Sequence, residues 1–309
     1  MSSQNDGPLL DALRGARWPA RRTVGAALPG AHRSQQRGTS GEFTEYRLYR
    51  QGDDPRQLDW KLLARSDRAF VRLTDDHAVV STWFALDASL SMAYPNTRSA
   101  VDGTVSKWAL ARSIAVGLAA VAHASGDPVG LVTTGANGPQ RMTARTRRGT
   151  VGELARLLDG VAVGGEHALS PLVTAVPMRA RLVILTDLLG DADDLLRVAA
   201  QRSAAGAIVE CVHVVAREEL ELPSGALLAR DPERASVERS MDRRLHAAYR
   251  QQFDAFRAER AQQWRASGAG YAEARTDVSA TRLVRQIIAG SGLDVVPAVA
   301  APTTPAGRG

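Results

Sequence analysis

The feature that most constrains this fold is a series of short apolar runs, rich in Val and Ile, that alternate with helical segments. Five runs are expected to be strands: residues 79–86, 128–134, 181–186, 207–215 and 271–276. Near-continuous apolar strands are typical of sheets buried on both faces, so this alternation predicts an α/β fold with a mostly parallel central sheet and helices on both faces. Residues 141–146 alternate in polarity and predict an edge strand paired with the preceding strand.

The helical segments differ in charge. Residues 106–124 carry only Lys107, Arg112 and His123 as potentially charged groups, which predicts a helix that is buried nearly all round. Residues 191–205 and 236–267 are more charged and are expected to form outer helices.

The organisation predicted along the chain has four parts. Residues 1–38 form an N-terminal arm with a short helical pattern, residues 39–78 a segment leading into the domain, and residues 79–290 the α/β domain. Residues 291–309 are rich in Pro and small residues without periodicity, which predicts a disordered tail.

Composition excludes several classes of protein. With 309 residues, 44% hydrophobic and 23% charged, the chain has the balance of an ordinary globular protein. No apolar stretch approaches the roughly 18 residues of a membrane span, and the polar, arginine-bearing N-terminus is unlike a signal peptide, so a cytoplasmic protein is expected. The single cysteine, Cys211, lies in an apolar run and is expected to be a buried hydrophobe, which excludes cysteine-based metal sites.

The net charge of +6 by itself suggests nucleic acid or an acidic surface as a partner. The 39 basic residues comprise two lysines and therefore 37 arginines, and the 15 aromatic residues form no stripe interleaved with basic residues. Because such a stripe is typical of single-strand binding, nucleic-acid binding is the weaker alternative. The arginine run of Arg141, Arg145, Arg147 and Arg148 is interpreted first as a solvated edge and second as a dock for an acidic partner.

Polar residues directly follow several of the apolar strands. In parallel sheets ligands bind at the carboxyl ends of the strands, so these residues are candidates for a functional site. Asp87, Ser89 and Ser91 form an Asp-x-Ser-x-Ser motif after the first strand, and Asp187 directly follows the strand 181–186. Ser170 stands before Pro171, the pattern of a helix N-cap followed by the first helical residue.

These five side chains are hard oxygen donors on three loops, which predicts a site for Mg²⁺ or Mn²⁺. Such a site leaves a coordination position open for an Asp or Glu of a partner. The competing interpretation is that the Asp and the two serines serve only as a turn and helix cap.

The same residues resemble the von Willebrand factor A fold and its metal-ion-dependent adhesion site. The resemblance implies Asp87, Ser89 and Ser91 for the first loop, Ser170 for the second-loop threonine, and Asp187 for the last carboxylate. Ser170 departs from the family by replacing threonine, and Glu166 competes for its position.

A second motif lies upstream, over residues 45–60, where a Gly-Asp-Asp-Pro turn is followed by Arg56, Asp59 and Trp60. From its interleaved acidic and basic residues alone, this segment predicts a salt-bridged clasp. It also resembles the signature of the bacterial domain of unknown function 58 family, in which such a segment precedes a von Willebrand factor A-like domain. The signature residues are Gly52, Asp53, Asp54, Arg56, Asp59 and Trp60. Members of that family are often encoded beside MoxR-type AAA+ ATPases, which implies a chaperone-like adaptor role.

The function predicted from these features is a non-enzymatic protein-binding module. The enzymatic alternative is a magnesium-dependent phosphoesterase, since aspartates end two strands. That chemistry normally uses a second carboxylate two positions after the first, where this chain has Ser89. The chain also has no Walker-type phosphate loop, so ATPase activity is expected only from a partner.

Overall fold

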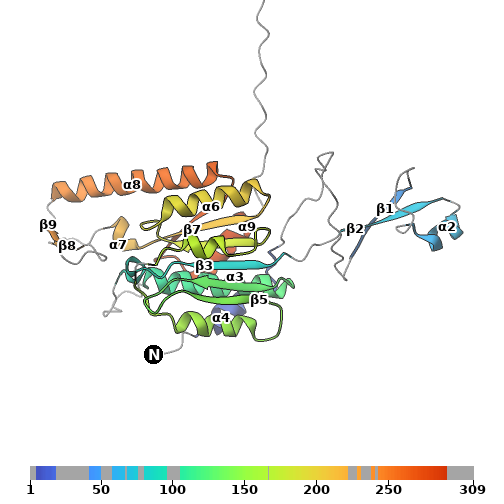
Figure 1. Cartoon of the computed structure of the whole chain (residues 1–309), viewed down its shortest axis with the longest axis horizontal. Coiled ribbons are helices and arrows are strands. Elements are labelled where there is room, and N and C mark those ends of the chain that lie inside the picture. Colours follow the sequence, from blue (N-terminus) through green and yellow to red (C-terminus); the bar gives the residue numbers. More distant parts are fainter. Residues whose placement is uncertain are drawn as a thin grey trace, which may run out of the picture. The chain divides into compact units, whose positions relative to one another are not determined.

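The computed structural model describes most of the chain. The described residues are 5–18, 42–49, 58–66, 68–75, 80–95, 105–165, 167–221, 228–230, 238–240 and 243–290. Their contacts define two compact units, one of residues 22–79 and one of residues 1–21 with 80–309. The smaller unit contains an antiparallel pair, β1 (Glu42–Leu48) and β2 (Phe70–Asp75), and the helix α2 (Trp60–Ser66) (Figure 1).

A six-stranded sheet forms the centre of the larger unit, in the order β10-β7-β6-β3-β4-β5. The strands are β3 (Thr82–Leu86), β4 (Val129–Thr133), β5 (Gln140–Arg145), β6 (Arg181–Thr186), β7 (Val209–Val215) and β10 (Gly270–Arg275). All neighbours are parallel except β5, which pairs antiparallel with β4. The predicted α/β fold with a mostly parallel sheet is confirmed, including its antiparallel edge strand.

Helices cover both faces because the inner strands are apolar on both sides. Residues of β3, β4, β6 and β7 are buried throughout. One core cluster joins the sheet to α1 (Gly7–Ala12), α3 (Lys107–Ala124), α4 (Thr150–Asp159) and α9 (Ala280–Gly290). The other joins it to α5 (Ser170–Thr174), α6 (Ala192–Ala204) and α8 (Arg243–Ala266). Alternate residues of β3 belong to the two clusters, so the two sets of helices cover opposite faces of the sheet.

The helices differ from the sequence prediction in two respects. The helix expected over residues 236–267 begins at Arg243, and residues 238–240 instead form β9 (Glu238–Ser240), paired with β8 (Leu228–Arg230). Helices α4 and α9 were not predicted, because ten or eleven residues give only about three turns of periodicity. The described part of the chain holds no helix that is long and apolar enough to cross a membrane.

Residues 5–18 belong to the larger unit and pack on its other residues. Arg112 in α3 forms two hydrogen bonds with the carboxylate of Asp6, at 2.6 and 3.0 Å. Trp18 is fully buried, and the guanidinium of Arg181 lies 4.2 Å from its ring centroid and donates to its carbonyl oxygen. A buried cation over an aromatic face is worth about 2 kcal/mol, so this contact holds the segment in place. The predicted tail, residues 291–309, lies outside the described residues.

Candidate functional site at the carboxyl ends of the strands

The first loop of the candidate site follows β3 and is ordered by its own aspartate. The N–H of Ser89 donates to Asp87 Oδ1 at 2.9 Å, and the hydroxyl of Thr186 at the end of β6 donates to Asp87 Oδ2, also at 2.9 Å. The hydroxyl oxygens of Ser89 and Ser91 lie 3.1 Å apart. The loop is therefore held across two neighbouring strands, with its two hydroxyls side by side.

The carboxyl group of Asp87 is buried close to a second carboxylate. Burial is the main reason why the pKa of Asp87 rises to about 6, and the charge of Asp187 raises it further. Hydrogen bonds from Ser89 and Thr186 favour the ionised form and oppose that rise. A divalent cation bound at Asp87 would favour the ionised form of this carboxyl group.

Asp187 lies at the end of β6, which is the parallel neighbour of β3. Its Oδ1 accepts from the N–H of Leu189 at 3.2 Å, and Oδ2 accepts from the ammonium of Lys107 at 2.8 Å. Leu188 has a φ of 59°, in the left-handed region where a non-glycine residue is strained by about 1–2 kcal/mol. Strain of this kind is concentrated at functional sites, where the surrounding structure holds it.

Lys107, at the start of α3, is a member of the site that the sequence analysis did not identify. Its ammonium lies between Asp187 Oδ2 and Glu219 Oε1, at 2.8 and 2.7 Å, and its side chain is 1% exposed. Glu219 belongs to α7 (Arg217–Leu220), and its other oxygen accepts from the N–H of Ala216. Burial lowers the pKa of Lys107, but the two carboxylates outweigh burial and raise it, so the ammonium stays charged.

A signal for Lys107 does exist in the sequence. It is one of only two lysines and opens a helix that is otherwise almost entirely apolar. A buried lysine requires a carboxylate partner, but the sequence does not show which one.

The second loop is arranged differently from the prediction. Ser170 is not the N-cap of α5, because Leu169 occupies that position and Ser170 is the first helical residue. The N–H of Ser170 donates to Asp191 Oδ2 at 2.7 Å, so a carboxylate from a distant loop caps this helix instead. The N–H of Gly164 donates to the carbonyl of Ala88 at 2.7 Å, which ties this loop to the first one.

Ser170 itself is buried, but among the described residues no hydrogen bond joins its hydroxyl to those of the first loop. The structure thus brings together Asp87, Ser89, Ser91 and Asp187, whereas none of the contacts among the described residues places Ser170 with them. The competing residue Glu166 lies outside the described residues.

The upstream signature is described only at its end. Gly52, Asp53, Asp54 and Arg56 lie outside the described residues. Asp59 accepts hydrogen bonds from the N–H groups of Lys61 and Leu62, both at 3.0 Å, and so caps the start of α2. Trp60 is largely exposed.

The donor set fits a hard divalent cation that is bound partly by hydroxyls. Within the described ranges, no group of three or more His, Cys, Asp or Glu residues could hold a metal ion, so the serine hydroxyls are essential to such a site. The hydroxyls of Ser89 and Ser91 lie together, and carboxylates end both adjacent strands. The buried ammonium of Lys107 neutralises part of this negative charge and weakens the attraction for a second cation.

Three exposed apolar side chains occur in the same loops. Leu90 begins the short 3₁₀ helix of residues 90–93, directly after Ser89, and Tyr94 follows this helix. Leu189 lies in the loop after β6, two positions after Asp187. The side chain of Tyr94 is exposed only in part, and partial burial of its hydroxyl is the main reason why its pKa is raised; the charges of the glutamates of α7 raise it further. The candidate site is therefore bordered by apolar surface.

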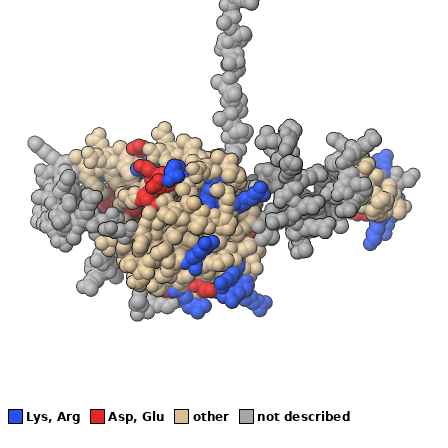
Figure 2. All heavy atoms as spheres, viewed as in Figure 1, with Lys and Arg blue, Asp and Glu red and all other residues tan. Residues whose placement is uncertain are grey.

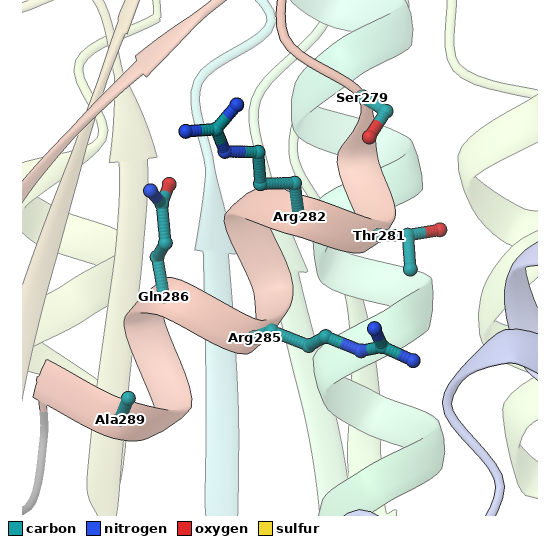
Figure 3. Close-up of a pocket in the computed structure, with 6 residues that line it drawn as sticks. All are labelled: Ser279, Thr281, Arg282, Arg285, Gln286 and Ala289. Atoms are coloured by element: carbon teal, nitrogen blue, oxygen red, sulfur yellow. The ribbon is translucent and has the colours of Figure 1, made fainter.

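A second surface feature lies on α9, where a hollow of about 410 Å³ is formed. Figure 3 shows Arg282 and Gln286 extending to one side of the helix and Arg285 to the other. Arg285 also donates to the carbonyl of Ala12, the last residue of α1, at 2.7 Å. None of the residues that line this hollow is a carboxylate, so it does not contribute to the candidate metal site.

The fold and the position of the site define an α/β protein with a mostly parallel sheet and polar loops at the carboxyl ends of its strands. Residues 45–263 match the family described as "Protein of unknown function DUF58". This match covers most of the chain, and the protein belongs to that family.

Similar proteins include the uncharacterized protein Rv1480 of Mycobacterium tuberculosis (strain ATCC 25618 / H37Rv), 28% identical over 286 residues, with 88% of this chain and 86% of Rv1480 covered. Among solved structures, BatB from Bacteroides thetaiotaomicron is 16% identical with a TM-score of 0.45, covering 69% of this chain and 98% of BatB. The SpRpn10 VWA domain is 12% identical with a TM-score of 0.41, covering 71% of this chain and all of that domain.

Proposed function

We propose that this protein is a non-enzymatic protein-binding module with a site for Mg²⁺ or Mn²⁺ at the carboxyl ends of β3 and β6. The observation that carries the proposal is the pair of serine hydroxyls, 3.1 Å apart, in a loop whose aspartate is bonded across to the end of β6. Asp87, Ser89, Ser91 and Asp187 would hold the ion. Ser170 is included as a fifth ligand on the strength of the family resemblance.

The chain's own residues prepare this site in two ways. Ser89 N–H and the Thr186 hydroxyl orient the carboxylate of Asp87, so little reorganisation is needed on binding. Lys107 fixes the carboxylate of Asp187 in position through their ion pair at 2.8 Å. When bound, the ion would supply an open coordination position for a carboxylate oxygen of the partner.

The surrounding surface favours a particular partner chemistry. Leu90, Tyr94 and Leu189 are exposed in the loops that carry the proposed ligands. A partner segment in which an Asp or Glu is flanked by apolar side chains would bury these residues while its carboxylate reaches the ion. Each well-buried apolar side chain contributes about 1.5–3 kcal/mol, which adds to the contribution of a single carboxylate.

The partner that we propose is a MoxR-type AAA+ ATPase, with this protein acting as its adaptor. The family resemblance is the support for this assignment, and the absence of a Walker-type loop from the sequence is compatible with it. In such a pair the ATPase would perform the nucleotide chemistry and this chain would provide recognition.

The test is a titration of the chelator-treated protein with Mn²⁺, followed by sedimentation of the protein with the purified ATPase in Mg²⁺ or in chelator. The double variant Ser89→Ala/Ser91→Ala should lose ion binding and ion-dependent association. Ser125→Ala is the matched control, because Ser125 ends α3 and its hydroxyl bonds only the carbonyl of Val121 among the described contacts. Equal association in chelator, or in the double variant, would contradict the proposal.

A further inference from the structure

Strand β5 forms an open edge of the central sheet. Its neighbour is β4, and no other described strand pairs with it. The outer side of such a strand presents backbone N–H and C=O groups that can pair with another extended chain. The register between β4 and β5 also shifts near Leu131, which indicates a bulge in this pair.

Exposed arginines concentrate along this edge. Residues 140–156 hold five arginines against one glutamate, Glu153, a net charge of +4. Glu153 on α4 forms ion pairs with Arg145 at 3.1 Å and Arg147 at 2.7 Å, so a single carboxylate is shared between two guanidinium groups. Figure 2 shows basic side chains on the side of the larger unit where β5 and α4 lie in Figure 1.

The arginines lie on both faces of the sheet. Arg141 is opposite Val132 and lies 5.1 Å from the ring centroid of Trp83, on the face covered by α5 and α6. Arg145 is opposite Val129, and its ion pair with Glu153 places it on the face covered by α4. A chain paired with β5 would therefore meet positive charge whichever way its side chains alternate.

We propose that the β5 edge binds an acidic polypeptide segment in an extended conformation, which adds a strand to the sheet next to β5. The backbone of the edge strand would provide the pairing, and the arginines would select carboxylate-bearing side chains. Residues 140–156 contain no aromatic residue on which a base could stack, and strand pairing requires a peptide backbone, so a polypeptide fits this edge better than a nucleic acid. This surface is separate from the proposed metal site and does not depend on it.

The test uses a fluorescein-labelled, end-capped peptide of alternating Glu and Thr, with binding measured by fluorescence anisotropy. We expect Arg141→Glu/Arg145→Glu to weaken binding at least about tenfold, because it reverses two charges next to the edge. The matched control Arg197→Glu/Arg250→Glu reverses two exposed arginines of α6 and α8 and should change binding less than about threefold.

A second probe tests strand pairing without altering the protein. The same peptide with N-methyl groups on alternate residues keeps its charge but cannot pair along one side, and it should bind at least about tenfold more weakly. Equal binding of the methylated peptide would show attraction by charge alone and would overturn the proposal. Absence of binding by the unmodified peptide, or tighter binding of single-stranded DNA of equal charge, would overturn it as well.

Discussion

Replacing Lys107 by Met tests whether the buried ammonium holds the carboxyl-end loops together. Methionine keeps most of the apolar stem of the side chain and fills a similar volume, but it removes both ion pairs, at 2.8 and 2.7 Å. The variant therefore isolates the charge from the packing of α3.

The size of the effect follows from burial. Asp187 is 2% exposed, so without Lys107 its carboxylate has neither a cation nor water to stabilise its charge. Removing one partner of a buried ion pair costs about 3–5 kcal/mol. The loss of the ion pair with Glu219 adds less to this cost, because Glu219 is 13% exposed to water and still accepts a hydrogen bond from the N–H of Ala216. For a unit of this size a loss of about 4 kcal/mol lowers Tm by roughly 8–16 °C.

The assay is urea unfolding followed by circular dichroism, in chelator so that no divalent ion replaces the ammonium. Lys107→Met/Asp187→Asn should be more stable than Lys107→Met alone, since the second change removes the unpaired charge. The control is Lys61→Met, which alters the only other lysine, an exposed one, and should cost less than about 0.5 kcal/mol. A cost below about 1 kcal/mol for Lys107→Met, or no recovery in the double variant, would refute this account of the site.

Three further predictions concern stability. Burial lowers the pKa of His213 to about 4, so its native state binds fewer protons than the unfolded chain, and its contribution of about 3 kcal/mol is lost as pH falls from about 6.5 to 4. The pKa of Asp87 is raised to about 6, so its native state binds more protons than the unfolded chain. This group therefore increases the free energy of unfolding by a similar amount as pH falls from 6 towards 4. In chelator, Asp87→Asn should therefore lose more stability than wild type between pH 7 and 4 and His213→Asn should lose less; parallel urea curves for all three would contradict both assignments. Trp18→Ala should cost about 3–5 kcal/mol through the loss of a fully buried indole and its contact with Arg181, and thermal melts would show an unchanged midpoint if the segment did not pack in solution. Arg202→Met should cost about 3 kcal/mol, because the buried guanidinium donates to carbonyls in and after α5, and hydrogen exchange should increase in α5 before it increases elsewhere.

The sheet could be predicted because its signal is local. Each inner strand is a short apolar run, and burial on both faces follows from that composition without knowledge of its neighbours. The strand order could not be predicted in this way, since β10 pairs with β7 through contacts between residues about 60 positions apart. The beginning of α8 was also misplaced, because the charged segment before it continues the helical composition while its backbone forms β9.

The candidate site also contains residues that could be predicted from local sequence and residues whose contacts could not. Asp87 and Asp187 were predicted because each directly follows an apolar strand, and the carboxyl ends of parallel strands meet at one edge. Ser170 was misassigned as an N-cap, because the group that satisfies its N–H is Asp191, 21 positions away. The N-cap prediction rested only on the neighbouring Pro171, because a contact with Asp191 cannot be inferred from local sequence.

The sequence by itself determined the class of fold, the strands of the central sheet and the carboxylates and hydroxyls that follow them, because each depends on the residues next to it. Only the tertiary structure decided the electrostatics of the site. Lys107 meets Asp187 across 80 positions of the chain and Glu219 across 112, and neither partner can be read from local pattern. The charge that a metal ion or a partner would encounter therefore depends on contacts that exist only after the sheet and α3 have packed together.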